Sequence, residues 1–202
     1  MKFFKIILLK IFLISCFATS KILVPMDLGQ TNHLKAYGLA YYSLTQGQNV
    51  EWLLNYRGGS FLFNDLPKIA ELCKIRNIKY EVISGSQVAQ IKKTIEQENM
   101  ESVLLEKAPK IAVYVPPTND PWDDAVRLAM DYAEIPYDTI YDEEIINGDL
   151  QKYDWLHLHH EDFTGQYGKF FTYRNADWYK EQVALGQRTA KKLGYSSVSK
   201  LK

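Results

Sequence analysis

Short apolar runs rich in β-branched residues alternate with amphipathic helical stretches from Ile22 onward, and this alternation constrains the fold more than any other feature. Strands are predicted at residues 22–25, 50–56, 79–83, 110–115, 137–141 and 154–159. Helices are predicted at residues 32–46, 65–76, 86–106, 122–133 and 176–193. Strands and helices in this order form successive βαβ units. The sequence therefore predicts an α/β fold with a mostly parallel sheet and flanking helices.

Residues 106–110 divide this pattern into two predicted halves. Pro109 cannot continue the helix that precedes it, and a new apolar strand begins directly after it. We expect an N-terminal α/β half at residues 21–108 and a second α/β half at residues 110–202. The second half is expected to be incomplete at its C-terminus, because residues 196–202 have the pattern of one isolated helical turn, which is marginal in water. A frayed natural terminus is the alternative.

The first twenty residues have the pattern of an export signal peptide. Lys2 and Lys5 give a basic start, residues 6–17 are mainly apolar, and small residues follow. This apolar run is too short to span a bilayer comfortably. Cleavage is expected either after Ser20 or before Cys16, where the sequence resembles a lipobox whose cysteine becomes lipidated. Both outcomes place the protein outside the cytoplasm, as a periplasmic protein or one lipid-anchored in the cell envelope. A buried N-terminal helix is the weaker alternative.

Charge and cysteine content exclude some functions. The whole chain has 24 basic and 24 acidic residues, and removal of residues 1–20 leaves 21 basic residues, a balance of −3. This balance gives no basis for binding nucleic acid, and contact with the membrane is expected only through the signal or a lipid on Cys16. Cys73 is then the sole cysteine, and its place in a predicted helix indicates a buried, inert thiol.

The first two predicted strands are followed by polar residues that favour a ligand site. Free amide groups at the start of a helix can receive an anion or a polar ligand, and paired glycines let the backbone approach a ligand that an arginine grips. A turn with a solvated arginine is the alternative for the second loop. The expected ligand-binding residues of these two loops are Asp27, Asn32, His33, Arg57, Gly58 and Gly59.

A third polar loop follows the strand predicted at residues 110–115. Asn119 and Asp120 precede Pro121, which suits the first turn of a helix, and Asp123 and Asp124 complement the helix dipole. Helix capping is a sufficient explanation for these side chains. Asn119 and Asp120 are nevertheless also candidates for ligand binding, because Pro116 and Pro117 stiffen the loop.

The last predicted strand leads directly into three histidines and two carboxylates. In open α/β sheets, ligands bind at the carboxyl ends of the strands, so His159, His160, Glu161 and Asp162 are expected ligand-binding residues. A sharper alternative is a metal site, since His157 and His159 lie on one face of the strand and an acidic residue follows. The aromatic segment 163–173 beyond them is interpreted as a lid, a sugar- or peptide-facing surface, or an ordinary packed loop.

Four segments resemble an exported bacterial family of Bacteroidetes type that is often labelled asparagine synthetase B. They read KILVPMDLGQTNHLKAYGLAYY, WLLNYRGGSF, YVPPTNDPWDDAVRLAMDYA and YDWLHLHHEDFTGQYGKF. The resemblance implies a flavodoxin-like fold of the class I glutamine amidotransferase-like type, with longer relatives that continue past Lys202 to a nucleophile elbow. Residue 2 is Lys2 and no Ser-Gly-Gly loop occurs, so neither the cysteine nor the ATP site of asparagine synthetase B is present. Cys73 does not match an elbow either.

These observations lead to three hypotheses about function. The first is an exported, amidotransferase-like protein whose strand ends form one polar pocket for a small polar or anionic ligand, without catalysis by these residues alone. The second is a non-catalytic binding or scaffold module of the cell envelope, and the third is a metal-dependent hydrolase that uses His157 and His159. No cofactor is expected, and no complete catalytic set is visible. The shared pocket of the first hypothesis comprises Asp27, His33, Arg57, Asn119, His159, His160 and Glu161.

Overall fold

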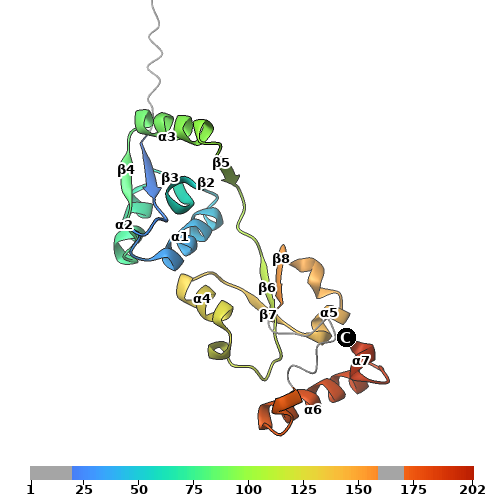
Figure 1. Ribbon diagram of the computed structural model, residues 1–202. Helices are drawn as coiled ribbons and strands as arrows, with labels where there is room; N and C mark the ends of the chain where they lie inside the picture. The colour runs from blue at the N-terminus through green and yellow to red at the C-terminus, as the bar shows by residue number, and fades with distance from the viewer. Residues whose placement is uncertain (1–19, 159–170) are drawn as a thin grey trace, which may run out of the picture.

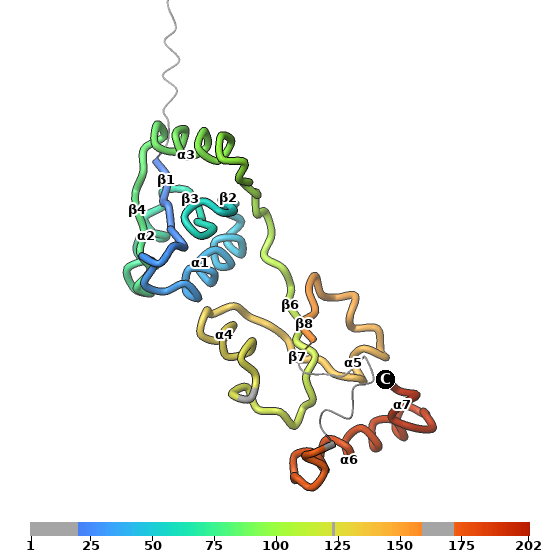
Figure 2. Tube along the Cα trace, viewed as in Figure 1, coloured from blue at the N-terminus to red at the C-terminus, as the bar shows by residue number. Residues whose placement is uncertain are grey.

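The computed structural model describes residues 20–158 and 171–202, and these form two sheets with flanking helices. The expected α/β class is confirmed. The first sheet has the order β4-β1-β3-β2-β5 and the second has the order β7-β6-β8. The chain leaves the first sheet at the end of β5, crosses residues 106–110 in an extended conformation and enters the second sheet with β6 (Figure 2).

Five strands, three α-helices and a 3₁₀ turn at Tyr56–Gly58 make up the described part of the chain before residue 106. The strands are β1 (Lys21–Val24), β2 (Val50–Leu54), β3 (Ser60–Asn64), β4 (Glu81–Ile83) and β5 (Glu101–Leu105). The helices are α1 (His33–Thr45), α2 (Pro67–Ile75) and α3 (Gly85–Gln97). Alternation along β1 sends Ile22 and Val24 to the core under α1 and α2, and Leu23 to the core under α3. The sheet is therefore covered on both faces (Figure 1).

The expectation of a parallel sheet is wrong for this part of the chain, because every strand pair in it is antiparallel. Two strands were not expected from the sequence. β3 follows β2 after a tight connection, and a connection that short can only reverse the chain. β5 lies in a segment where a helix over residues 86–106 was predicted; the helix ends at Gln97, and Asn99 then adopts a left-handed conformation with φ of 52°.

The second sheet is parallel throughout, as expected. Its strands are β6 (Ile111–Tyr114), β7 (Asp138–Ile140) and β8 (Trp155–Leu158), and β6 lies in the middle. Numbered along the chain, the order is second, first, third, which is how a flavodoxin-like sheet begins. The flanking helices are α4 (Ala125–Ala133), α5 (Asp142–Ile146), α6 (Asp177–Lys192) and the short α7 (Val198–Leu201), with 3₁₀ turns at Pro121–Asp123, Asp149–Lys152 and Phe171–Tyr173.

Helices α1 and α4 join the two sheets. A Cβ atom on Gly38 of α1 would lie 1.7 Å from the carbonyl oxygen of Ala133, so the helices approach more closely than any side chain permits. Tyr132 and Glu134 at the end of α4 contact the start of α1: Asn32 donates to the Tyr132 hydroxyl (2.8 Å), and Lys35 pairs with Glu134 (2.6 Å). The contact between α1 and α4 therefore fixes the second sheet against the first.

Candidate functional site

The polar residues that follow β1 and β2 do meet, for a reason that differs from the expected parallel pairing. Both strands are antiparallel to β3, so β1 and β2 point the same way and their carboxyl ends lie on the same side of the sheet. Arg57 there donates from Nε to Oδ2 of Asp27 and from Nη1 to Oε1 of Glu81, each over 2.8 Å. These carboxylates raise the pKa of Arg57, Glu81 more than Asp27, and the Arg57 hydrogen bond is the main cause that lowers the pKa of Asp27. The guanidinium is thus already neutralised.

The glycines beside Arg57 form a hairpin turn. Gly58 has φ of 80°, and a Cβ atom there would lie 2.4 Å from the carbonyl oxygen of Met26. Gly59 has φ of 92° and accepts a hydrogen bond from the indole of Trp52 (3.0 Å). The close approach that the paired glycines predicted is therefore made by the chain's own backbone.

Asn32 and His33 are likewise engaged in the fold. Asn32 caps α1, with its side-chain oxygen accepting from the amide of Lys35 (3.2 Å). Nε2 of His33 lies 3.1 Å from the carbonyl oxygens of both Met26 and Asp27, so it carries the proton and donates. The cap and this histidine hold the loop between β1 and α1 in place.

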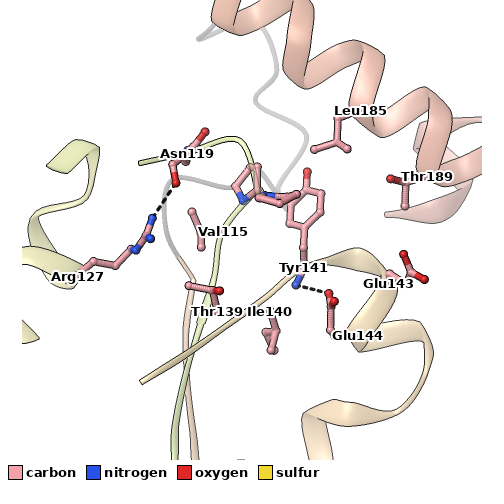
Figure 3. Close-up of a pocket in the computed structure, with 12 residues that line it drawn as sticks. Val115, Asn119, Arg127, Thr139, Ile140, Tyr141, Glu143, Glu144, Leu185 and Thr189 are labelled. Carbon is pink, nitrogen blue, oxygen red and sulfur yellow. Dashed lines mark hydrogen bonds between the residues drawn. The ribbon is translucent and has the colours of Figure 1, made fainter. Parts of the chain in front are cut away.

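A pocket of about 260 Å³ lies at the carboxyl ends of β6 and β7 (Figure 3). Its walls come from the loop after β6, from α4, from the end of β7 and the start of α5, and from α6. The lining residues are Val115, Pro116, Pro117, Asn119, Arg127, Thr139, Ile140, Tyr141, Glu143, Glu144, Leu185 and Thr189. Of the residues predicted for one shared pocket, Asn119 lies here, whereas Asp27, His33 and Arg57 lie at the edge of the other sheet.

Arg127 is the most unusual side chain of this pocket, because it is charged and only 7% exposed. Its Nη1 donates to the backbone carbonyl of Asn119 (3.1 Å). Within residues 20–158 and 171–202, its Nε has no hydrogen-bond partner and its guanidinium has no ion pair. Figure 3 shows the guanidinium extending from α4 toward the Asn119 side of the pocket. A buried cation without a counter-ion is costly unless a ligand supplies one.

The opposite wall carries two carboxylates that already have partners. Oε2 of Glu144 accepts from the amide of Tyr141 (2.9 Å) at the start of α5. Both oxygens of Glu143 accept from Nζ of Lys192 on α6 (2.6 and 2.7 Å). The pocket therefore has a cationic wall and an acidic wall, and the acidic wall is held in position by α5 and α6.

The capping role predicted near Pro121 belongs to Asp124. Its Oδ1 accepts from the amides of Val126 (2.8 Å) and Arg127 (3.2 Å), so α4 begins at Ala125 and not at residue 122. Asp120 is exposed, makes no capping hydrogen bond and does not line the pocket. Arg127 was not predicted from the sequence, although its spacing from the buried Met130 and Ala133 places it on the face of α4 that turns inward.

Next to the pocket, Lys202 lies over the rings of Tyr114 and Tyr141, 5.0 and 4.4 Å from their centres. Its Nζ also contacts Oδ1 of Asp142 at 3.0 Å, and Tyr114 donates to the same carboxylate. Both charged side chains are largely buried, with 16% and 6% exposed. This ion pair attaches the end of α7 to the strand ends of the second sheet.

Only part of the histidine cluster falls within the described residues. His157 pairs in register with Val113, is half-buried and lies 6.3 Å from the Trp155 ring. His159, His160, Glu161, Asp162 and the aromatic residues 163–170 lie outside the described residues, as do residues 1–19 with Cys16. Among the residues described, no group of three or more His, Cys, Asp or Glu side chains is arranged to hold a metal ion.

Cys73 of α2 is fully buried, as predicted, in the core formed by α1, α2 and the first sheet. Burial raises the pKa of its thiol to about 12. A thiol that is neutral and inaccessible at physiological pH is not a nucleophile. In the described parts of the chain, no helix combines the length and the apolar character needed to cross a bilayer.

Fold and pocket together define the class: an α/β protein with a small polar pocket at the carboxyl edge of a parallel sheet. No protein-family model matches the chain, and no curated protein matches it. Among solved structures, it is similar to a formyltetrahydrofolate deformylase from Pseudomonas putida KT2440, with 16% sequence identity and a TM-score of 0.19. The match covers 77% of this chain and 55% of that structure, so the chain spans about half the deformylase. A TM-score this low carries no information about function.

Proposed function

We propose that the chain is the ligand-binding part of an exported α/β protein of the glutamine amidotransferase-like type. In this proposal a small polar ligand binds in the pocket at the carboxyl ends of β6 and β7. In this proposal the described residues bind the ligand, and Cys73, which is buried and neutral, is not an amidotransferase nucleophile. The four segments that resemble the exported family often labelled asparagine synthetase B are the basis of this proposed family assignment.

The position of the pocket carries this proposal. Ligands of open α/β sheets bind outside the carboxyl ends of parallel strands, where loops to helices on both faces diverge. The pocket after β6 and β7 has this location, and a volume of about 260 Å³ suits a ligand below the usual drug-like range. The order second, first, third of the parallel sheet is also the order with which an amidotransferase-like domain would begin.

A pocket-filling substitution tests ligand binding. Thr189→Phe on α6 places a ring in the pocket without touching either strand, so it should abolish the thermal stabilisation that small polar compounds give the purified protein. Thr45→Phe at the exposed end of α1 is the matched control and should leave that stabilisation unchanged. If no small polar compound stabilises the protein, or if both variants respond alike, the proposed pocket is not a ligand site.

Export is tested separately from binding. Residues 1–20, fused to a reporter enzyme that is active only outside the cytoplasm, should give activity, and a fusion without residues 6–17 should give none. Because β1 begins at Lys21, cleavage after Ser20 leaves the first sheet intact. Incorporation of a labelled fatty acid that is lost in Cys16→Ser would assign the lipid-anchored form. A cytoplasmic reporter would contradict the export proposal.

An exposed aromatic pair favours a second function, that of an envelope-binding module. Tyr173 and Trp178 are 54% and 49% exposed, with ring centres 5.8 Å apart. Exposed aromatic faces of this kind stack on sugar rings or pack on peptides. In this alternative, Tyr173→Ser with Trp178→Ser weakens retention on isolated cell-wall polysaccharide while Thr189→Phe has no effect. Loss of retention in Thr189→Phe, with no effect of the two aromatic substitutions, would favour ligand binding in the pocket instead.

The metal-dependent hydrolase is tested by metal analysis. It depends on His157 together with His159, and only His157 lies within the described residues. Zinc bound at one equivalent after exposure and dialysis, and lost in His157→Ala, would establish the site. A stoichiometry near zero would dismiss it.

A further inference from the structure

We propose that the pocket binds a small organic carboxylate and that Arg127 is the residue that holds its negative charge. This inference rests on the proposed function, since it names the class of ligand for the same pocket. Arg57, the arginine that the sequence indicated for an anion, is excluded from this role by its two carboxylate partners. Arg127 has no carboxylate partner in the described part of the chain.

The guanidinium of Arg127 is prepared for an anion. An arginine has five N–H donors, and here Nη1 donates to Asn119 while the buried Nε donates to no described residue. The bond to the Asn119 backbone fixes the side chain, so little entropy is lost when a ligand binds. A carboxylate in the pocket can accept from the terminal N–H groups of the Arg127 guanidinium, in the two-pronged arrangement that arginine favours.

The other wall of the pocket selects the charge of the ligand. Glu143 and Glu144 line the pocket opposite Arg127, and one further cation, Lys192, pairs with Glu143. A dianion such as phosphate would therefore be repelled by the acidic wall more than a monoanion would be. The same wall leaves room for a hydroxyl or an amine at the far end of the ligand, with Thr139 and Thr189 as neighbouring hydroxyls.

The apolar part of the lining sets the size of the ligand. Val115, Ile140 and Leu185 lie between the charged walls and offer a short apolar surface. With a volume of about 260 Å³, the pocket is smaller than the roughly 300–1,000 Å³ of most ligand sites. The ligand that fits these features is a monocarboxylate with a chain of a few carbon atoms.

Nuclear magnetic resonance of the Arg127 side chain tests this proposal on the purified protein. The Nε–H signal of Arg127, assigned by its absence in Arg127→Met, should shift and saturate as butyrate is added. Butyramide, which has the same shape without the charge, should bind at least about tenfold more weakly, because bonds to a charged acceptor are the stronger ones. Inorganic phosphate should also bind more weakly than butyrate.

Matched variants separate the possible outcomes. Arg127→Met should reduce butyrate affinity at least about tenfold, whereas Arg188→Met, which removes an exposed arginine of α6, should not. Thr189→Phe should abolish the Nε–H shift while keeping Arg127, so the test does not depend on the folding of Arg127→Met. Equal binding of butyrate and butyramide, or tighter binding of phosphate than of butyrate, would overturn the carboxylate proposal. The proposed function would still stand if Thr189→Phe blocked that binding. Absence of any effect of Thr189→Phe would overturn the proposed function as well.

Discussion

Two arginines lie near the carboxyl ends of strands, Arg57 in the turn after β2 and Arg127 on α4 beside β6, and they differ in what surrounds them. Arg57, at the edge of the antiparallel sheet, has 31% of its side chain exposed and donates to two carboxylates. Arg127, beside the parallel sheet, is 7% exposed and donates to one backbone carbonyl. Arg57, which is paired within the chain, supports the fold, whereas the buried Arg127, which has no ion pair among the described residues, is the residue we propose for the ligand. The environment, and not the residue type, distinguishes the binding residue.

The largest effect is expected from breaking the contact that joins the two regions. Gly38→Val places side-chain atoms where α1 meets the carbonyl of Ala133, so it should destabilise the protein by about 3 kcal/mol. Gly186→Ala on α6 is the control, because its new Cβ atom would lie at an ordinary 3.4 Å from Val198. It should leave the stability unchanged or raise it by up to about 1 kcal/mol. Similar urea midpoints for both variants would contradict the close approach.

Removal of the paired arginine should have a smaller effect. Arg57→Met leaves Asp27 and Glu81 facing each other without a cation, and partly exposed ion pairs of this kind contribute little. The unfolding temperature should fall by about 2–4 °C. Lys68→Met removes the cation of the exposed Lys68–Glu71 ion pair on α2, and it should lower the unfolding temperature less. A larger shift in Lys68→Met would show that the Arg57 cluster does not support the fold.

The contribution of Arg57 should depend on pH in a defined direction. The hydrogen bond from Arg57 is the main cause that holds the pKa of Asp27 below 3.8. A carboxylate with a lowered folded pKa stabilises the protein fully above its unfolded pKa and loses that effect as the pH falls through the folded pKa. The difference in unfolding temperature between the wild type and Arg57→Met should therefore stay constant from about pH 7 to 5 and shrink below about pH 4. A difference that grows on acidification would refute this assignment.

The smallest expected effect concerns Cys73, which reports on the first sheet alone. Its buried thiol should react with iodoacetamide only through opening of the structure. Arg57→Met should raise the rate at pH 8 by a factor of about 5, which corresponds to 1 kcal/mol, and Arg127→Met should leave it unchanged. Equal acceleration by both variants would show that the two regions do not open separately.

Strands with continuous runs of β-branched residues were predicted from the sequence. The direction of neighbouring strands was predicted wrongly where it depends on the turn that connects them. β3 follows the left-handed residues Asn55 and Arg57, which no helix or strand pattern reveals, and this turn makes β3 antiparallel to β2. β5 is an edge strand in which polar and apolar residues are mixed. Its sequence extends the helical spacing of the apolar residues before it, so a helix was predicted there. The parallel β6, β7 and β8 follow ordinary βα connections, so their prediction was confirmed.

The pocket lies at strand ends, as the sequence predicted for a ligand site, but its lining differs from the predicted residues. Ligand binding was predicted at the carboxyl ends of strands, and the pocket after β6, which Asn119 lines, lies at such ends. The sequence could not show that Asp27 and Glu81, distant in sequence, neutralise Arg57, because that pairing depends on three strands meeting at one edge. Arg127 was overlooked because a single arginine in a helix is usually solvated. Its burial follows from the packing of α4 on the sheet.

Thermal unfolding of Arg57→Met and Arg127→Met, measured side by side without ligand, tests the central claim most directly. A buried and unpaired guanidinium costs stability in the free protein. Arg127→Met should therefore unfold at the wild-type temperature or above it, while Arg57→Met unfolds below it. If Arg127→Met loses as much stability as Arg57→Met or more, then Arg127 serves the fold, and the contrast between the two arginines is wrong.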